Sequence, residues 1–246
     1  MVDLQFADPA LAALYDDVCP RAERRDFDFY LPMTLKARSV LDLGCGTGAF
    51  LREVREAGHE GRLCGLDPAA GMIAQARRHA GIEWRQGDIV SASYRDAFGL
   101  VVMTGHAFQV LVEDHQVRAA LAAAHAALVT SGCFAFETRN PKARAWEGWT
   151  TDSMAVVVDS AGQPVNVDCR VIAPFDGHMV SFTQTYTSPR WPEPRVSPST
   201  LRFLDVATLA AFLAEAGFAI EAWSGDWDGS PLGDRSPQVI VLAQRS

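Results

Sequence analysis

The stretch that most limits the possible folds of this chain is residues 40–50, Val-Leu-Asp-Leu-Gly-Cys-Gly-Thr-Gly-Ala-Phe. Its apolar first half ends in glycines at alternate positions, Gly44, Gly46 and Gly48, and an apolar helical pattern follows directly. Glycine permits positive φ and a close approach of ligand to backbone, and a helix N-terminus offers unpaired N–H groups. The stretch therefore predicts a buried strand, a tight turn and a helix that together cradle a nucleotide-type ligand.

Strand and helix patterns alternate from residue 38 onward. This alternation predicts an α/β fold with a parallel sheet and helices on both faces, joined by right-handed crossovers. Near the C-terminus a helix capped by Asp205 is followed by two apolar runs joined by a long loop, which favours an antiparallel hairpin at the sheet edge. The expected strands are 40–43, 63–66, 82–86, 100–103, 132–137, 218–223 and 238–243.

Two segments lie outside this pattern. Residues 1–37 are expected to form a helical cover, bent or ended at Pro32, that closes over the glycine cradle or simply covers the sheet edge. Residues 138–203 alternate apolar and polar positions over 154–158, 165–172 and 179–187, with a short strand at 201–204. We expect an antiparallel insertion that roofs the acceptor pocket or forms a dimer surface, and a single domain, 1–246, whose core is 38–137 and 204–246.

Polar or glycine residues stand at four predicted strand ends: Asp42–Gly48, Asp67, Gly87-Asp88 and Thr104–His106. Ligands of parallel α/β sheets bind at the carboxyl ends of the strands, so these groups should meet in one crevice. A carboxylate about 20 residues beyond the glycine turn suits ribose hydroxyls. The ligand is therefore expected to contain a nucleoside.

Two ligands of this kind are compatible with the loop. The spacing of Gly44, Gly46 and Ala49 fits a dinucleotide fingerprint, but Asp42 would then lie near a pyrophosphate of like charge. A ligand with an ammonium group would instead be anchored by Asp42. S-adenosylmethionine has an adenine, a ribose, an α-amino group and a sulfonium, and it has no phosphate.

The segments Val40–Gly48, Gly65–Pro68 with Met72 and Ala76, and Gly87-Asp88 together resemble the class I S-adenosylmethionine-dependent methyltransferases. The resemblance spans about 38–137 and resumes near 204–243, and it implies a Rossmann-like sheet of seven strands with an antiparallel last strand. It implies roles for individual residues as well. Gly44, Cys45 and Gly46 would contact the methionine portion of the cofactor, and Asp67 would bind its ribose hydroxyls. Pro68 and Met72 would pack against the adenine, and Asp88 and Ile89 would contact the adenine edge. Thr104, His106 and Phe108 would line the space between cofactor and acceptor. Tyr15, Asp42, Gly48 and Gly87 complete the expected cofactor site.

The chemistry of methyl transfer requires mainly alignment of donor and acceptor and exclusion of water. His106 is the candidate general base because its unperturbed pKa lies near neutrality, although packing beside the cofactor is an alternative role. Tyr30, Trp146 and Trp191 are the candidates for acceptor contacts.

Composition narrows the class of acceptor. The formal net charge is −8, with 22 Lys and Arg against 30 Asp and Glu, so a nucleic-acid partner is not expected. No apolar stretch approaches the roughly 18 residues that cross a bilayer, and the five separated cysteines form no metal-binding pattern. We expect a cytoplasmic enzyme that methylates nitrogen or oxygen of a small molecule and holds no metal, and a homodimer is compatible with its exposed sheet. An NAD-dependent oxidoreductase and a noncatalytic nucleoside-binding protein are the alternatives.

Overall fold

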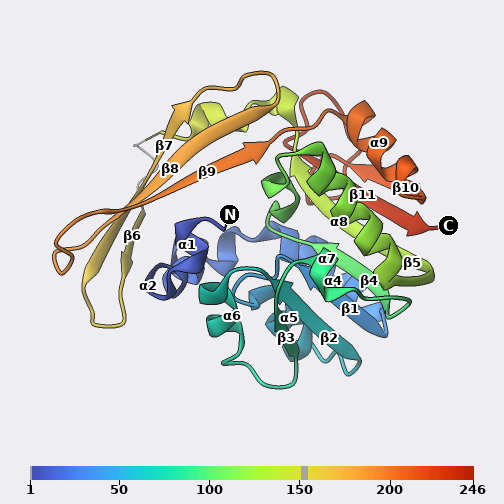
Figure 1. Cartoon of the computed structure of the whole chain (residues 1–246), viewed down its shortest axis with the longest axis horizontal. Helices are drawn as coiled ribbons and strands as arrows, with labels where there is room; N and C mark the ends of the chain where they lie inside the picture. The colour runs from blue at the N-terminus through green and yellow to red at the C-terminus, as the bar shows by residue number, and fades with distance from the viewer. Residues whose placement is uncertain (1, 151–154) are drawn as a thin grey trace.

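The computed structural model describes residues 2–150 and 155–246, and its largest element is a seven-stranded sheet (Figure 1). The strand order is β10-β11-β5-β4-β1-β2-β3; β11 runs antiparallel to both neighbours, whereas β1 pairs in parallel with β2 and β4. The strand order reverses between β1 and β4, which is where such sheets bind ligands. The strands are β1 Ser39–Leu43, β2 Arg62–Asp67, β3 Glu83–Gln86, β4 Phe98–Met103, β5 Leu128–Arg139, β10 Phe218–Ser224 and β11 Gln238–Arg245. The expected mostly parallel sheet with an antiparallel last strand is confirmed.

Helices cover both faces of this sheet, as expected. On one face Leu121 of α8 and Leu213 of α9 pack with Phe134 and Phe136 of β5 in the larger core cluster. On the other face α4 and α5 contribute residues such as Phe50 to a second cluster. The helices of the core are α4 Arg25–Lys36, α5 Ala49–Glu56, α6 Ala70–Ala76, α7 Ile89–Ala92, α8 Asp114–Ala127 and α9 Val206–Glu215.

The N-terminal segment is helical, in short pieces that precede α4. They are α1 Leu4–Ala7, α2 Pro9–Ala12, α3 Tyr15–Val18 and the 3-10 turn η1 Arg21–Glu23. The helix does not end at Pro32, which was one of the two predicted outcomes, because α4 continues through Pro32 to Lys36. Its buried face carries Phe27 and Tyr30 into the second core cluster, and this packing outweighs the roughly 3 kcal/mol that an interior proline costs.

A separate antiparallel sheet lies between β5 and α9 in the chain. Its order is β6-β7-β8-β9, with β6 Ala155–Val158, β7 Pro164–Ala173, β8 Met179–Thr187 and β9 Arg195–Arg202. In Figure 1 this sheet projects from the core, and α1 and α2 lie between the two sheets. The first predicted strand began at Met154, which lies outside the described residues.

The last strand of this sheet differs from the prediction of a short strand at 201–204 after a proline-rich loop. β9 begins earlier, at Arg195, and includes Pro198, which pairs with Thr183 of β8. β9 is an edge strand, so the missing N–H of Pro198 removes no bond that a second neighbour would need. The 3-10 turns η3 Pro141–Ala143 and η4 Ala145–Gly148 connect the core to this sheet, and η2 Ala107–Val110 follows β4.

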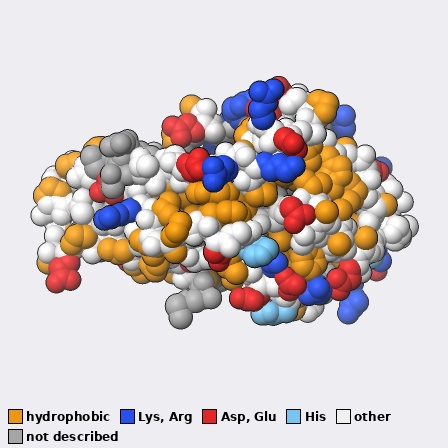
Figure 2. All heavy atoms as spheres, turned by 90° about the horizontal axis from the view of Figure 1, so that it is seen from above, with side chains coloured by type: hydrophobic (Ala, Val, Ile, Leu, Met, Phe, Trp, Pro, Cys, Tyr) orange, Lys and Arg blue, Asp and Glu red, His pale blue; other side chains and the backbone are white. Residues whose placement is uncertain are grey.

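Acidic and basic side chains are interspersed on the face of the molecule shown in Figure 2. Apolar side chains also reach the surface of the second sheet, where Val156, Val158 and Ile172 are each more than half exposed. Within the described residues, none of the helices has the length and apolar character needed to cross a membrane.

Candidate active site

The glycine loop joins β1 to α5, and all three of its glycines have left-handed φ, +75° at Gly44, +55° at Gly46 and +80° at Gly48. A Cβ at Gly44 would lie 2.8 Å from the Ala107 side chain, and one at Gly48 would clash with the Trp84 ring. At Gly46 a Cβ would meet nothing within 4 Å. The loop is therefore packed tightly at both ends and open at its centre, which leaves room for a ligand against the Gly46 backbone.

Asp67, the last residue of β2, is bonded directly to this loop. Its Oδ2 accepts a hydrogen bond from the Gly46 N–H at 2.9 Å, and its Oδ1 accepts one from the Ala69 N–H at 2.8 Å. Burial raises the pKa of Asp67, and these two backbone hydrogen bonds oppose the increase. Each carboxylate oxygen can accept a further bond, so Asp67 can hold the glycine loop and bind a ligand hydroxyl at the same time.

Asp42 lies on β1 beneath the same loop and is fully buried. Neither carboxylate oxygen has a hydrogen-bond partner among the described residues. The pKa of Asp42 is raised to about 8, chiefly by burial; the positive charge of Arg24 opposes the increase, and the negative charges of Asp67 and Glu137 add to it. An unpaired carboxylate in the interior is costly, so this position favours either a bound proton or a nearby cation.

The residues expected around adenine are distributed around the start of α6 and α7. Met72 is buried in a small cluster with Ala12, against which Tyr15 of the N-terminal segment packs. Asp88 caps α7, because its carboxylate accepts the Ser91 N–H at 2.8 Å, and Ile89 follows it in the core. Gly87 donates its N–H to the Asp67 carbonyl oxygen at 3.0 Å. Pro68 is exposed between β2 and α6.

The loop after β4 holds His106 in a left-handed conformation, with φ of +61°. Its backbone N–H donates to Glu137 Oε1 at 2.6 Å, and its ring Nε2 lies 2.8 Å from Gln238 Oε1. Burial, and secondly the positive charge of Arg139, lower the pKa of His106 well below its usual value. The imidazole is therefore neutral at physiological pH and retains a basic nitrogen.

Glu137 is the chief polar residue of this region that the sequence analysis missed. It lies near the end of β5, is fully buried, and accepts a 2.6 Å hydrogen bond from the Tyr30 hydroxyl as well as the bond from His106. Burial, then the charge of Asp26, raises the pKa of Glu137 to about 7. The only signal in the sequence is a carboxylate that interrupts an apolar strand just before its end.

The N-terminal segment contacts both loops of the candidate site. The Thr47 hydroxyl in the glycine loop donates to the Asp16 carboxylate at 2.6 Å. Arg24 forms a 2.7 Å ion pair with Asp26 and covers Gly105, where a Cβ would lie 3.1 Å from the guanidinium. Residues 15–26 therefore lie over the carboxyl ends of β1 and β4.

Several predicted residues are held mainly by packing in the apolar core. Phe108 packs against Phe136 in the core, with ring centroids 4.5 Å apart. Tyr30, Trp146 and Trp191 belong to three different apolar clusters: Tyr30 packs with α5, Trp146 with Phe203, and Trp191 beside Val157 and Val165. Thr104 is buried in the loop after β4.

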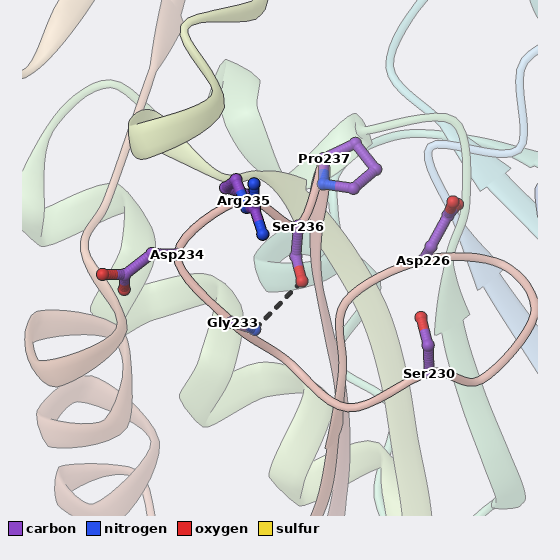
Figure 3. A pocket seen from close by; sticks show the side chains of 7 residues that line it. All are labelled: Asp226, Ser230, Gly233, Asp234, Arg235, Ser236 and Pro237. Carbon is purple, nitrogen blue, oxygen red and sulfur yellow. Dashed lines mark hydrogen bonds between the residues drawn. The ribbon is translucent and has the colours of Figure 1, made fainter.

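Two open hollows lie elsewhere on the molecule. One, of about 470 Å³, is formed by the β10–β11 loop and lined by Asp226, Ser230 and residues 233–237 (Figure 3). The other, of about 510 Å³, lies on β7 and β8. Neither is lined by a residue of the predicted site, and neither carries a buried group that would select a ligand.

Comparisons with known proteins agree with this geometry. Residues 40–132 match the family model described as a methyltransferase domain. The chain is 26% identical over 232 residues to the cypemycin N-terminal methyltransferase of a Streptomyces species, a match that covers 86% of this chain and 84% of that protein. It is 35% identical over 83 residues to 2-phytyl-1,4-naphtoquinone methyltransferase of Thermosynechococcus vestitus, which covers 32% of this chain and only 37% of the relative's length.

Solved structures share the fold over the whole chain. The CcbJ methyltransferase from Streptomyces caelestis superposes with a TM-score of 0.75 at 18% identity and full coverage of both chains. CalS10, an amino pentose methyltransferase from Micromonospora echinaspora solved with S-adenosylmethionine bound, has a TM-score of 0.67 at 21% identity, covering 94% of this chain and 95% of its own. Of the interpretations open at the sequence level, the oxidoreductase finds no support and the methyltransferase is confirmed. The matched methyltransferase domain spans the glycine loop, and the last strand of the sheet is antiparallel, so both findings support a class I S-adenosylmethionine-dependent methyltransferase.

Proposed function

We propose that this enzyme transfers a methyl group from S-adenosylmethionine to the amino nitrogen of a small-molecule acceptor. The observation that carries the proposal is the pair of buried acidic side chains, Asp42 on β1 and Glu137 on β5, together with His106, which has a neutral ring and donates its backbone N–H to Glu137. An amine that accepts a methyl group gains positive charge, which nearby carboxylates stabilise. The names of two matched proteins, an amino pentose methyltransferase and the cypemycin N-terminal methyltransferase, also favour nitrogen.

The residues of the first crevice fit the cofactor. The open space at Gly46 would receive the methionine portion, Asp67 the ribose hydroxyls, and the unpaired Asp42 the ammonium group. We assign the adenine to the surface formed by the residues that follow β2 and β3, namely Pro68, Met72, Gly87, Asp88 and Ile89. The remaining residues of the proposed cofactor site are Tyr15, Cys45, Gly48, Thr104 and Phe108. When bound, S-adenosylmethionine supplies an electrophilic methyl group on sulfur.

His106 is the proposed base. If Nε2–H donates to the Gln238 oxygen, Nδ1 keeps its lone pair and can remove a proton from the amine. Glu137 positions His106 by accepting its backbone N–H, and Tyr30 orients Glu137 through the second oxygen. Residues 15–26 exclude water from the two loops. The insertion, 138–203, with Trp146 and Trp191, would complete the acceptor chamber.

Matched acceptors test the choice of nitrogen. The enzyme, radiolabelled cofactor and a panel of small amines would be compared with the same molecules carrying a hydroxyl in place of the amine, with product located by mass spectrometry. We expect label on the amine and none on the hydroxyl analogue. Label on oxygen alone would refute the assignment of nitrogen.

We also infer, from the net charge of −8, that the acceptor is a free small molecule rather than a nucleic acid. The exposed valines of the second sheet suit a homodimer, which sedimentation analysis would reveal. A gel-shift assay with duplex and single-stranded DNA and RNA should show no binding at physiological salt.

A further inference from the structure

Arg139 is the last residue of β5 and lies at the junction of the two sheets. Its Nη1 donates to Gln109 Oε1 at 2.8 Å, and its guanidinium carbon lies 5.3 Å from the centroid of the Trp149 ring. In the β5–β11 register Arg139 pairs with Gln238, the residue that contacts the His106 ring. The guanidinium is therefore placed beside the proposed base and between the core and the insertion.

This arginine has no carboxylate partner within 4.0 Å in the part of the chain that the structure describes. Other enclosed arginines do have one: Arg24 pairs with Asp26 at 2.7 Å, and Arg202 pairs with Asp114 at 2.5 Å. Glu137, two residues earlier on β5, already accepts from Tyr30 and from the His106 backbone. A guanidinium has five N–H donors, and here only the bond to Gln109 engages one of them within the described residues.

The electrostatics agree with a positive charge that its surroundings compensate only in part. Burial lowers the pKa of Arg139, and the negative charge of Glu137 only partly opposes this effect. Arg139 in turn lowers the pKa of His106. A bound anion would relieve both effects, because it would compensate the buried charge of Arg139 and make the His106 ring a stronger base.

We propose that Arg139 binds an oxyanionic group of the methyl acceptor, a carboxylate or a phosphate, so that the preferred acceptors are amines that also carry a negative charge. This inference rests on the proposed N-methyltransferase function. The planar guanidinium suits bidentate binding of such a group, and the Trp149 ring packs against one face of the guanidinium plane. The anion would hold the acceptor near His106, with the amine directed toward the cofactor.

The test compares acceptors that share an amine and differ in one remote group: a carboxylate, a phosphate, or a neutral amide or hydroxymethyl group. Each would be assayed with the wild-type enzyme, Arg139→Gln, Arg139→Lys and the control Arg190→Gln, which removes an exposed arginine after β8. We expect Arg139→Gln to raise KM for the preferred anionic acceptor by about ten- to a hundredfold, with little change in kcat. KM for neutral acceptors should change less than about threefold, and Arg139→Lys should be intermediate. Of the acceptor that carries a carboxylate and the one that carries a phosphate, the one with the lower KM for the wild-type enzyme identifies the oxyanion that Arg139 binds.

Two further measurements separate the possible failures. Calorimetric binding of S-adenosylmethionine should be unchanged in Arg139→Gln, which also shows that the variant is folded. NMR titration of His106 should give a higher pKa in Arg139→Gln than in the wild type, since one positive neighbour is lost. If no amine is methylated by the wild type, the proposed function fails. If amines are methylated but charged and neutral acceptors respond equally to Arg139→Gln, only the role of Arg139 is overturned.

Discussion

The Thr47 hydroxyl donates a 2.6 Å hydrogen bond to the Asp16 carboxylate, and this bond ties the N-terminal cover to the glycine loop. Thr47→Val removes the donor and keeps the shape of the side chain. We expect cofactor to dissociate about three- to tenfold faster, since a hydrogen bond of this kind contributes about 1 kcal/mol. Stopped-flow fluorescence of Trp84, whose ring packs over Gly48, would report the change. Thr130→Val on the exposed start of β5 is the matched control and should leave the rate unchanged.

Asp67→Ala should weaken binding of S-adenosylmethionine by about 1.5–3 kcal/mol, the usual effect of losing hydrogen bonds to a charged group. The same change removes the bond from the Gly46 N–H and so loosens the glycine loop. Isothermal calorimetry measures the affinity, with Glu60→Ala, an exposed carboxylate at the opposite end of β2, as the control. Equal affinities for Asp67→Ala and the wild type would show that this residue does not bind the cofactor.

Binding of cofactor should release a proton from Asp42. Without a partner, Asp42 has a pKa of about 8 and is mostly protonated at pH 7, and a ligand ammonium beside it would lower that pKa. Calorimetry in two buffers of different ionisation enthalpy should detect up to about one proton released per site. Asp42→Asn should abolish the release. A release of the same size in Asp42→Asn would place the ammonium elsewhere.

The same substitution has a pH-dependent effect on stability. Because burial raises the pKa of Asp42 from 3.8 to about 8, its contribution to stability is complete below pH 3.8 and is lost as pH rises through about 8. Asparagine resembles the protonated carboxyl. Asp42→Asn should therefore match the wild type in acid and be more stable at pH 9, by about 2–5 kcal/mol, in urea unfolding.

His106→Ala should lower kcat by more than about tenfold with a productive amine, because it removes the proposed base. The lowered pKa of His106 keeps the ring neutral, so the wild-type rate should hold from pH 8 to 6.5 and fall only at more acid pH. His115→Ala on the exposed start of α8 is the control. A smaller loss in His106→Ala would exclude its role as a base and leave it a packing residue.

The sequence predicted the parts of the fold that depend on residues close to one another in the chain. The glycine loop, the alternation of strands and helices, and the C-terminal hairpin follow from spacings within a few turns of chain, and the structure contains all of them. Pro32 and Pro198 misled the prediction because each was judged as a local breaker. Packing of α4 and the edge position of β9 decide these two cases.

The polar residues around His106 could not be found in this way. Glu137 receives its bonds from Tyr30 and His106, which are 107 and 31 residues away, and Gln238 is 132 residues from His106. Their roles depend on which strands become neighbours, and that order appears only in the folded sheet. The aromatic candidates Trp146 and Trp191 were chosen by residue type, and tertiary packing places them in separate clusters.

The N-terminal cover reaches the glycine loop through Asp16 and the loop after β4 through Arg24. One continuous segment of the chain thus contacts both loops at which we propose that the cofactor and the acceptor bind, so exchange of either ligand would displace this same segment. Turnover would then be gated by a single opening step common to the spent cofactor and the methylated product. A compound that binds between Arg24 and Gly105 would slow the release of both the spent cofactor and the methylated product. It would therefore act as a non-competitive inhibitor toward either substrate.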